Sequence, residues 1–324
     1  MMLSVALVVG GLALLGVGGE VLLRGAVGLA ARLRLTPAVI GLTVVAAGTS
    51  VPELAVSAIA SVQDQTDIAV GNVVGSNIFN VVFILGLCAL VRPLIVAGNT
   101  IRLEYPVMAL VTLLCVAISE DGTISRIEAT LLLAIYVAFT AYMVSLVRRQ
   151  MNETEIREFD DAIDDLGAAR APERSLAVLL GLVGGGVVLL GAGAQATVSG
   201  ASDLARLIGL SERVIGLTIV AVGTSLPEVV TSLVSSARGR DDVAIGNVIG
   251  SNLFNILGIL GLSAAVRPLV VHPLIIERDQ WWMLGVTLLL LPLMYSGFRV
   301  ARWEGALLLA VYAVYLTQLL AAPA

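Results

Sequence analysis

One stretch of about fifty residues occurs twice in this chain, and the residues that the two copies share are mostly not the large apolar ones. Residues 41–94 and 216–269 align without a gap at an offset of 175 and are identical at 31 of 54 positions. The identities include Thr, Ser, Pro, Glu, Asn and Gly. Polar residues cost free energy inside a bilayer and mark functional positions there. The repeat therefore predicts a duplicated polar centre.

The composition predicts an integral membrane protein. The 324 residues are 58% hydrophobic and 13% charged, with a mean hydropathy of +0.99, whereas a soluble domain carries about 25% charged residues. Cys88 and Cys115 fall inside apolar stretches and are interpreted as small core residues. Apolar stretches long enough to cross the hydrocarbon predict ten spans, at 3–20, 38–60, 68–90, 104–118, 127–147, 175–194, 213–235, 243–265, 280–297 and 302–321.

Five spans per half is an odd number, so the second half enters the membrane from the opposite side. We predict an all-α integral membrane protein with ten transmembrane helices as two inverted five-helix repeats. Residues 1–147 form the first repeat and residues 175–324 the second. The acidic segment 148–174 between them does not match an EF-hand loop and is interpreted as a solvated cytoplasmic linker.

Arginine positions set the expected orientation. Arg24, Arg32 and Arg34 follow the first span, and several more lie in the central loop, whereas the loops after spans 2 and 4 hold only Arg126. The positive-inside rule then places both termini outside and the central loop in the cytoplasm. In the second half the arginines are evenly divided between the two sides, so the predicted orientation depends on the first half alone. We expect a multi-pass protein of the plasma (inner) membrane.

The first shared motif, G-T-S-x-P-E, occupies residues 48–53 and 223–228. Pro52 and Pro227 predict a helix break, because proline lacks an N–H and displaces the carbonyl four residues earlier. Such a break at mid-membrane requires protein or a wet cavity to satisfy the freed groups. Glu53 and Glu228 lie deep in their spans, where they repel each other unless a cation lies between them or one is protonated.

The second shared motif, G-N-x-x-G-S-N-x-F-N, occupies residues 71–80 and 246–255. In a helix Asn72, Ser76 and Asn80 form one polar stripe, beside a stripe of small residues that admits a neighbouring helix. We expect Asn72 and Asn247 to hydrogen-bond to neighbouring helices. Cation coordination is expected from Ser76, Asn80, Ser251 and Asn255.

The candidate ligand atoms are all oxygens. His272, the only histidine, falls in a predicted loop, and no cysteine joins the cluster. Such a set suits Ca²⁺ and Na⁺ and does not suit Zn²⁺ or Cu⁺. Two carboxylates offset one Ca²⁺ or two Na⁺. Because the same oxygens cannot hold both loads, binding is expected to be competitive, which is the physical basis of antiport.

The two motifs resemble the alpha repeats of the sodium/calcium exchanger family, within the cation/calcium antiporter superfamily. The resemblance implies exchange of Ca²⁺ for Na⁺ by alternating access, with Glu53 and Glu228 holding Ca²⁺ near the midplane. It also implies that the glycine-rich first and sixth spans slide across the core. The Na⁺ sites implied by the match use the side chains of Thr49, Ser50, Thr224, Ser225, Ser76 and Ser251 and the backbone carbonyls of Ala46 and Ala221.

One departure concerns Asn255, where some members of the family, including potassium-dependent ones, carry Asp; Asn in both halves argues against potassium dependence. We expect the transported ions, a competing proton and the lipid bilayer as partners, with no prosthetic group, no nucleic acid and no protein partner. The chain is expected not to be an enzyme.

Three alternatives stay open. A Ca²⁺/H⁺ antiporter would use the same two glutamates, although protons alone need no hydroxyl cage. An intramembrane hydrolase using Ser50 or Ser225 is disfavoured, because no histidine is near and no G-x-S-x-G elbow is present. An ion channel fits inverted broken helices and midplane carboxylates less well than a binding-and-release cycle does.

Overall fold

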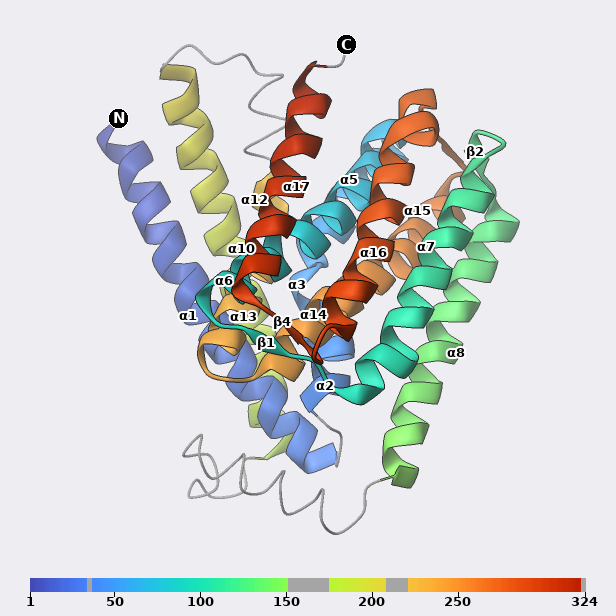
Figure 1. The fold of residues 1–324 in the computed structure, drawn as a ribbon. Coiled ribbons are helices and arrows are strands. Elements are labelled where there is room, and N and C mark those ends of the chain that lie inside the picture. Colours follow the sequence, from blue (N-terminus) through green and yellow to red (C-terminus); the bar gives the residue numbers. More distant parts are fainter. Residues whose placement is uncertain (34–36, 151–174, 208–220, 322–324) are drawn as a thin grey trace.

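The computed structural model describes residues 1–33, 37–150, 175–207 and 221–321 (Figure 1). The fold is a helical bundle whose long segments run in alternating directions. Six described helical segments are long and apolar enough to cross a membrane, and one bent pair adds a seventh. The six are Met2–Leu29, Thr66–Val91, Thr100–Ser119, Arg126–Leu146, Leu176–Leu204 and Asp241–Val266.

The two halves follow the same order of elements. Segments marked η are π-helical turns, wider than an α-helix. The first half contains α1 (Met2–Leu33), α2 (Pro37–Ile40), η1 (Gly41–Val45), α3 (Ala46–Thr49), α4 (Val51–Val62), α5 (Thr66–Phe79), η2 (Asn80–Ile84), α6 (Leu85–Val91), β1 (Leu94–Ile95), η3 (Thr100–Glu104), α7 (Tyr105–Ser119), β2 (Thr123–Ile124) and α8 (Arg126–Gln150).

The described part of the second half repeats this order about 175 residues later, and the counterparts of α2 and η1 fall outside the described residues. Its elements are α10 (Leu176–Leu207), α12 (Ala221–Thr224), α13 (Leu226–Ala237), α14 (Asp241–Leu253), η5 (Phe254–Leu260), α15 (Gly261–Val266), β3 (Leu269–Val270), η6 (Ile275–Asp279), α16 (Gln280–Tyr295), β4 (Arg299–Val300) and α17 (Arg302–Ala321). The acidic linker, and residues 213–220 at the start of the seventh predicted span, lie outside the described residues.

The two halves meet at both ends of the bundle. The chain begins and α17 finishes at one end, whereas α8 finishes and α10 begins at the other (Figure 1). Strand β1 pairs antiparallel with β4, and β2 pairs with β3, so each pair joins one strand from each half. The sequence predicted a helical protein, which the structure confirms, but it did not predict these short strand pairs. A hydropathy pattern cannot predict strands of two residues. Each of these strands also pairs with a strand of the other half, a contact that no local pattern indicates.

Helices α1 and α10 are longer than predicted. The sequence placed their ends at residues 20 and 194, but they continue to Leu33 and Leu207. Hydropathy marks the apolar part of a helix, whereas the helix itself continues through the polar turns that follow. The predicted 38–60 span contains the break that was expected at Pro52: η1 and α3 meet α4 at an angle of 54°.

Glycines every seven residues line the contact between α1 and α10. A Cβ on Gly11 would lie 2.7 Å from the Gly193 carbonyl, and one on Gly186 would lie 2.6 Å from the Leu22 nitrogen. Neither helix could carry larger residues there without moving apart. The same close approach holds along the seam at Gly18, Gly25, Gly193 and Gly200. By contrast, Gly10, Gly16, Gly184, Gly185 and Gly191 of the same two helices meet no described atom within 4 Å.

Helix α10 also lies against both helix breaks. A Cβ on Gly48 would lie 2.9 Å from Val187 Cγ2, and a Cβ on Gly223 would collide with Val198. The second motif shows similar close packing at Gly250, against the Leu42 carbonyl. Gly75 is the first-half equivalent of Gly250, and Leu217 is the second-half equivalent of Leu42. Because Leu217 lies outside the described residues, close approach at Gly75 stays a prediction.

Candidate functional site

The predicted helix break is present, and it places Glu53 at the start of a new helix. Chain direction changes at Ser50 (φ −83°, ψ 12°), and α4 begins at Val51 with Pro52 and Glu53 in its first turn. In the second half α13 begins after Ser225 in the same way, with Glu228 in its first turn. The positive end of a helix dipole favours a carboxylate at this position.

The serine at each break hydrogen-bonds to the glutamate of the other half. S-x-x-E is the pattern of a capping box, yet neither serine caps its own helix. Ser50 Oγ donates to Glu228 Oε1 at 2.7 Å, and Ser225 Oγ donates to Glu53 Oε1 at 2.8 Å. Both carboxylates are 1% exposed. No basic side chain in the described ranges forms an ion pair with either one.

The threonines of the motif lie beside the same carboxylates. Thr224 is within interaction range of Glu53, and Thr49 of Glu228. Thr49 also contacts Asn247 Oδ1 at 3.4 Å. The Ala46 carbonyl already accepts the Ser50 N–H at 3.0 Å and the Thr49 hydroxyl at 3.2 Å. A cation at that carbonyl would have to share or displace these bonds. Ala221, its equivalent, is the first residue of α12.

The second motif contributes Ser76 to the same place and buries its other predicted ligands. Ser76 Oγ lies 3.3 Å from Ser225 Oγ. Asn72 and Asn247 make interhelical hydrogen bonds as expected: Asn72 donates to Ser57 Oγ at 2.9 Å and Asn247 to Ser232 Oγ at 2.9 Å. The expected ligands Asn80, Ser251 and Asn255 are each at most 1% exposed.

Five buried oxygens of this cluster have no protein hydrogen-bond partner in the described structure. Buried polar atoms are nearly always paired, so each such atom needs an explanation. The five come from both halves and from both motifs. They are Glu53 Oε2, Glu228 Oε2, Asn80 Oδ1, Asn255 Oδ1 and Ser251 Oγ.

Two asparagines that sequence reasoning did not select also lie in the cluster. Asn77 and Asn252 are 1% and 2% exposed. Asn80 donates to Asn252 Oδ1 at 3.0 Å, and Asn255 donates to Asn77 Oδ1 at 2.9 Å. The helical stripe used to choose ligands passes through Ser76 and leaves Asn77 about 100° away from it. Their presence in both copies of the motif was the signal that could have found them.

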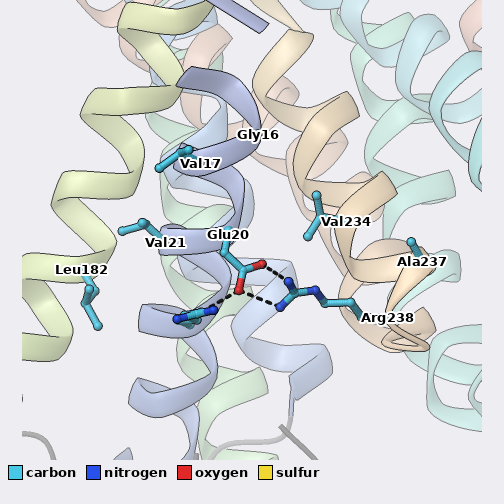
Figure 2. Close-up of a pocket in the computed structure, with 9 residues that line it drawn as sticks. Gly16, Val17, Glu20, Val21, Leu182, Val234, Ala237 and Arg238 are labelled. Atoms are coloured by element: carbon cyan, nitrogen blue, oxygen red, sulfur yellow. Dashed lines mark hydrogen bonds and ion pairs between the residues drawn. The ribbon is translucent and has the colours of Figure 1, made fainter. Parts of the chain in front are cut away.

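A second polar feature lies at the end of the bundle where α1 finishes. Glu20 on α1 pairs with Arg24 on the same helix, Nε to Oε1, at 2.5 Å. It also accepts from Arg238, between α13 and α14, at 2.7 Å and through a second, closer contact. Figure 2 shows the carboxylate between the two guanidinium groups. They line an open groove of about 610 Å³ whose other walls include Val17, Leu182 and Val234.

The cluster offers hard oxygen ligands and two acidic groups. No group of three His, Cys, Asp or Glu that could hold a metal occurs among the described residues. His272 Nδ1 instead accepts a bond from the Leu274 N–H at 3.1 Å. Two carboxylates with hydroxyl and amide oxygens suit Ca²⁺ or Na⁺. The fold and the cluster together define a multi-pass membrane protein with a buried polar centre.

Comparison with known proteins gives the family. The sodium/calcium exchanger protein family model matches residues 3–145 and 178–321. This chain is 36% identical to the inner membrane protein YrbG of Escherichia coli (98% of this chain, 97% of YrbG) and 33% identical to the sodium/calcium exchanger MaX1 of Methanosarcina acetivorans (95% and 96%). A solved structure of the sodium-calcium exchanger NCX_Mj, soaked with zero Na⁺ and Ca²⁺, superposes with a TM-score of 0.82 at 31% identity, covering 98% of this chain and 99% of that one.

The chain therefore belongs to the sodium/calcium exchanger family. It is an integral, multi-pass membrane transporter and not an enzyme, and its class of activity is cation/Ca²⁺ antiport.

Proposed function

We propose that this protein exchanges Ca²⁺ for Na⁺ across the membrane by alternating access. The ions bind at one oxygen-lined site between the two breaks, where Glu53 and Glu228 supply the charge. Ca²⁺ and Na⁺ compete for the shared oxygens, and protons compete for the carboxylates. The ligand set is Glu53, Glu228, Thr49, Ser50, Thr224, Ser225, Ser76, Asn80, Ser251 and Asn255, with the carbonyls of Ala46 and Ala221.

The five unpartnered oxygens carry this proposal. A buried carboxylate oxygen without a donor is costly, and two such oxygens beside three neutral ones are costlier still. A cation among them offsets that cost, since all five are acceptors or can act as acceptors. The crossed serines support the same site, because they hold each carboxylate by one oxygen and leave the other free.

We further propose the ten-span plan with two inverted five-helix repeats, residues 1–147 and 175–324, and a cytoplasmic linker at 148–174. The repeated order of elements, the alternating direction of successive segments and the strand pairs between halves support it. The arginine distribution supports an orientation with both termini outside. The similar protein YrbG is named an inner membrane protein, which supports the inner membrane as the location of this protein.

The deciding experiment measures ⁴⁵Ca²⁺ uptake into proteoliposomes with an imposed Na⁺, K⁺ or H⁺ gradient, the membrane potential being clamped. We expect an outward Na⁺ gradient to drive uptake and a K⁺ gradient to have no effect. Uptake driven by H⁺ alone would replace Na⁺ with the proton as the coupling ion. Uptake without any gradient of a counter-ion would reject antiport.

A further inference from the structure

Four asparagines form a closed set across the two halves, and two of them, Asn80 and Asn255, are proposed ligands. Asn77 Nδ2 donates to the Asn252 backbone carbonyl at 3.3 Å, and Asn252 Nδ2 donates to the Asn77 carbonyl at 3.4 Å. Each amide oxygen of this inner pair then accepts from a ligand asparagine, at 3.0 Å from Asn80 and at 2.9 Å from Asn255. The same pattern of bonds occurs from each half.

The backbone carbonyls fix the direction of every amide in the set. A carbonyl can only accept, so Asn252 must turn its Nδ2 toward the Asn77 carbonyl. Its Oδ1 then faces Asn80, which can meet it only with Nδ2. Asn80 Oδ1 is consequently turned away, and it is one of the five unpartnered oxygens. In the same way, the Asn252 carbonyl fixes the amide of Asn77, whose Oδ1 accepts from Asn255 Nδ2. Asn255 Oδ1 is then turned away as well.

We propose that Asn77 and Asn252 are positioning residues, which turn the side-chain oxygens of Asn255 and Asn80 toward the cation. This inference rests on the proposed function. The inner pair touches no ion itself. Without it, each ligand amide could rotate by half a turn and present an NH₂ group, which repels a cation.

The set also determines which residue is accepted at position 255. The Asn77 oxygen needs a donor opposite it, which asparagine provides and an ionised aspartate does not. Asp at 255 could donate to that oxygen only in its protonated form. Asn255 therefore belongs with Asn77 as a pair, and the same reasoning joins Asn80 to Asn252.

A double-mutant cycle tests this pairing. The four proteins are wild type, Asn252→Leu, Asn80→Asp and the double variant, in detergent. The readout is the rise of the unfolding midpoint with added Na⁺ or Ca²⁺, which reports binding without transport. The midpoint without ions controls for stability.

Each single variant should bind Na⁺ and Ca²⁺ about tenfold more weakly. Asn252→Leu lets Asn80 rotate, and Asn80→Asp sets an anionic oxygen against Asn252 Oδ1. The double variant should regain affinity to within about threefold of wild type, because a carboxylate presents an oxygen whichever way it turns. Asn80→Asp alone carries the same added charge and so controls for charge.

A double variant that binds no better than Asn252→Leu overturns the positioning role. If Asn252→Leu does not fold, the mirrored set with Asn77→Leu and Asn255→Asp makes the same test. Asn252→Ser, which keeps an acceptor oxygen, should retain more affinity than Asn252→Leu. A wild-type midpoint that responds to neither Na⁺ nor Ca²⁺ would reject the proposed function itself.

Discussion

The crossed hydrogen bonds at the two breaks match within 0.1 Å, at 2.7 Å for Ser50–Glu228 and 2.8 Å for Ser225–Glu53. The two ends of the bundle, in contrast, do not carry matching side chains. Glu20 on α1 is bound by Arg238, but 175 residues away the equivalent positions are Gln195 and Gln63. Gln195 makes a 3.3 Å bond to Ser199 on its own helix, where Glu20 pairs with Arg24.

This comparison separates two requirements. Under the proposed function, a cation between the halves is bound equally by ligands from both, which is a reason for the centre to keep its symmetry. The two ends face different compartments and need not match. Among the described residues, an ion pair joins the α1–α10 pair to the rest of the bundle at one end, through Arg238. The four changes below test the comparison from its strongest to its weakest consequence.

Loss of either carboxylate should abolish exchange. Glu53→Gln and Glu228→Gln each remove one buried negative charge, which for a buried ion contact corresponds to a loss of about 100-fold or more. Na⁺-driven ⁴⁵Ca²⁺ flux in proteoliposomes measures it. Equal losses support a symmetric centre. Flux like that of wild type in either variant contradicts the two-glutamate site.

Loss of either crossed serine should weaken Ca²⁺ binding by about tenfold or more, since a hydrogen bond to a charged group contributes about 1.5–3 kcal/mol. Ser50→Ala and Ser225→Ala are compared by the Ca²⁺ concentration at half-maximal flux. Ser61→Ala is the matched control, because among the described residues its hydroxyl bonds to the Ser57 carbonyl of the same helix, at 2.9 Å, and to no group of the other half. A control loss as large as the other two would mean that packing, not the crossed bonds, is measured.

Glu20 on α1 and Arg238 beyond α13 are joined across the groove of Figure 2. Removal of this pair should let the two sides of the groove separate more often. The two side chains are 20% and 41% exposed, so the pair contributes about 0.5–1 kcal/mol and its loss shifts a two-state equilibrium about two- to fivefold. The effect of Glu20→Gln is measured as the rate at which maleimide labels a cysteine placed at Val234, in a protein with Cys88 and Cys115 changed to Ser. The rate should rise by the same two- to fivefold.

The variant with both Glu20→Gln and Arg238→Gln reproduces the residues of the other half. Because either single change already breaks the pair, the double variant should label no faster than Glu20→Gln alone. Strictly additive effects of the two changes on labelling would show that the residues act separately.

The smallest effect is expected at Asp64. Its φ is +63°, and its equivalent is Gly239 with φ +72°. Asp64→Gly relieves a left-handed backbone at an aspartate but loses the exposed pair with Arg267, at 2.8 Å. Both contributions are about 1 kcal/mol or less, so the unfolding midpoint should move by no more than about 3 °C. A much larger fall would give the pair a structural importance that its exposure does not suggest.

Several parts of this arrangement could be predicted from the sequence. The break at Ser50, the interhelical bonds of Asn72 and Asn247 and the gathering of both motifs follow from proline chemistry and from polar residues that need partners in an apolar environment. The crossed serine–glutamate bonds could not be predicted. An offset of 175 shows which residues are equivalent, but equivalence does not say which ones touch. Asn77 was missed for the same reason, since its partners lie on the other half.

The crossed serines have a consequence for what half of this chain could do alone. Residues 1–147 contain Glu53 but not Ser225, and residues 175–324 contain Glu228 but not Ser50. Each half thus holds a carboxylate whose hydroxyl donor is encoded elsewhere. In the proposed arrangement, a single half could complete the proposed ion shell only beside a second copy inserted the other way up. Joining the two copies in one chain fixes their ratio at one to one and frees each copy to change at its own end.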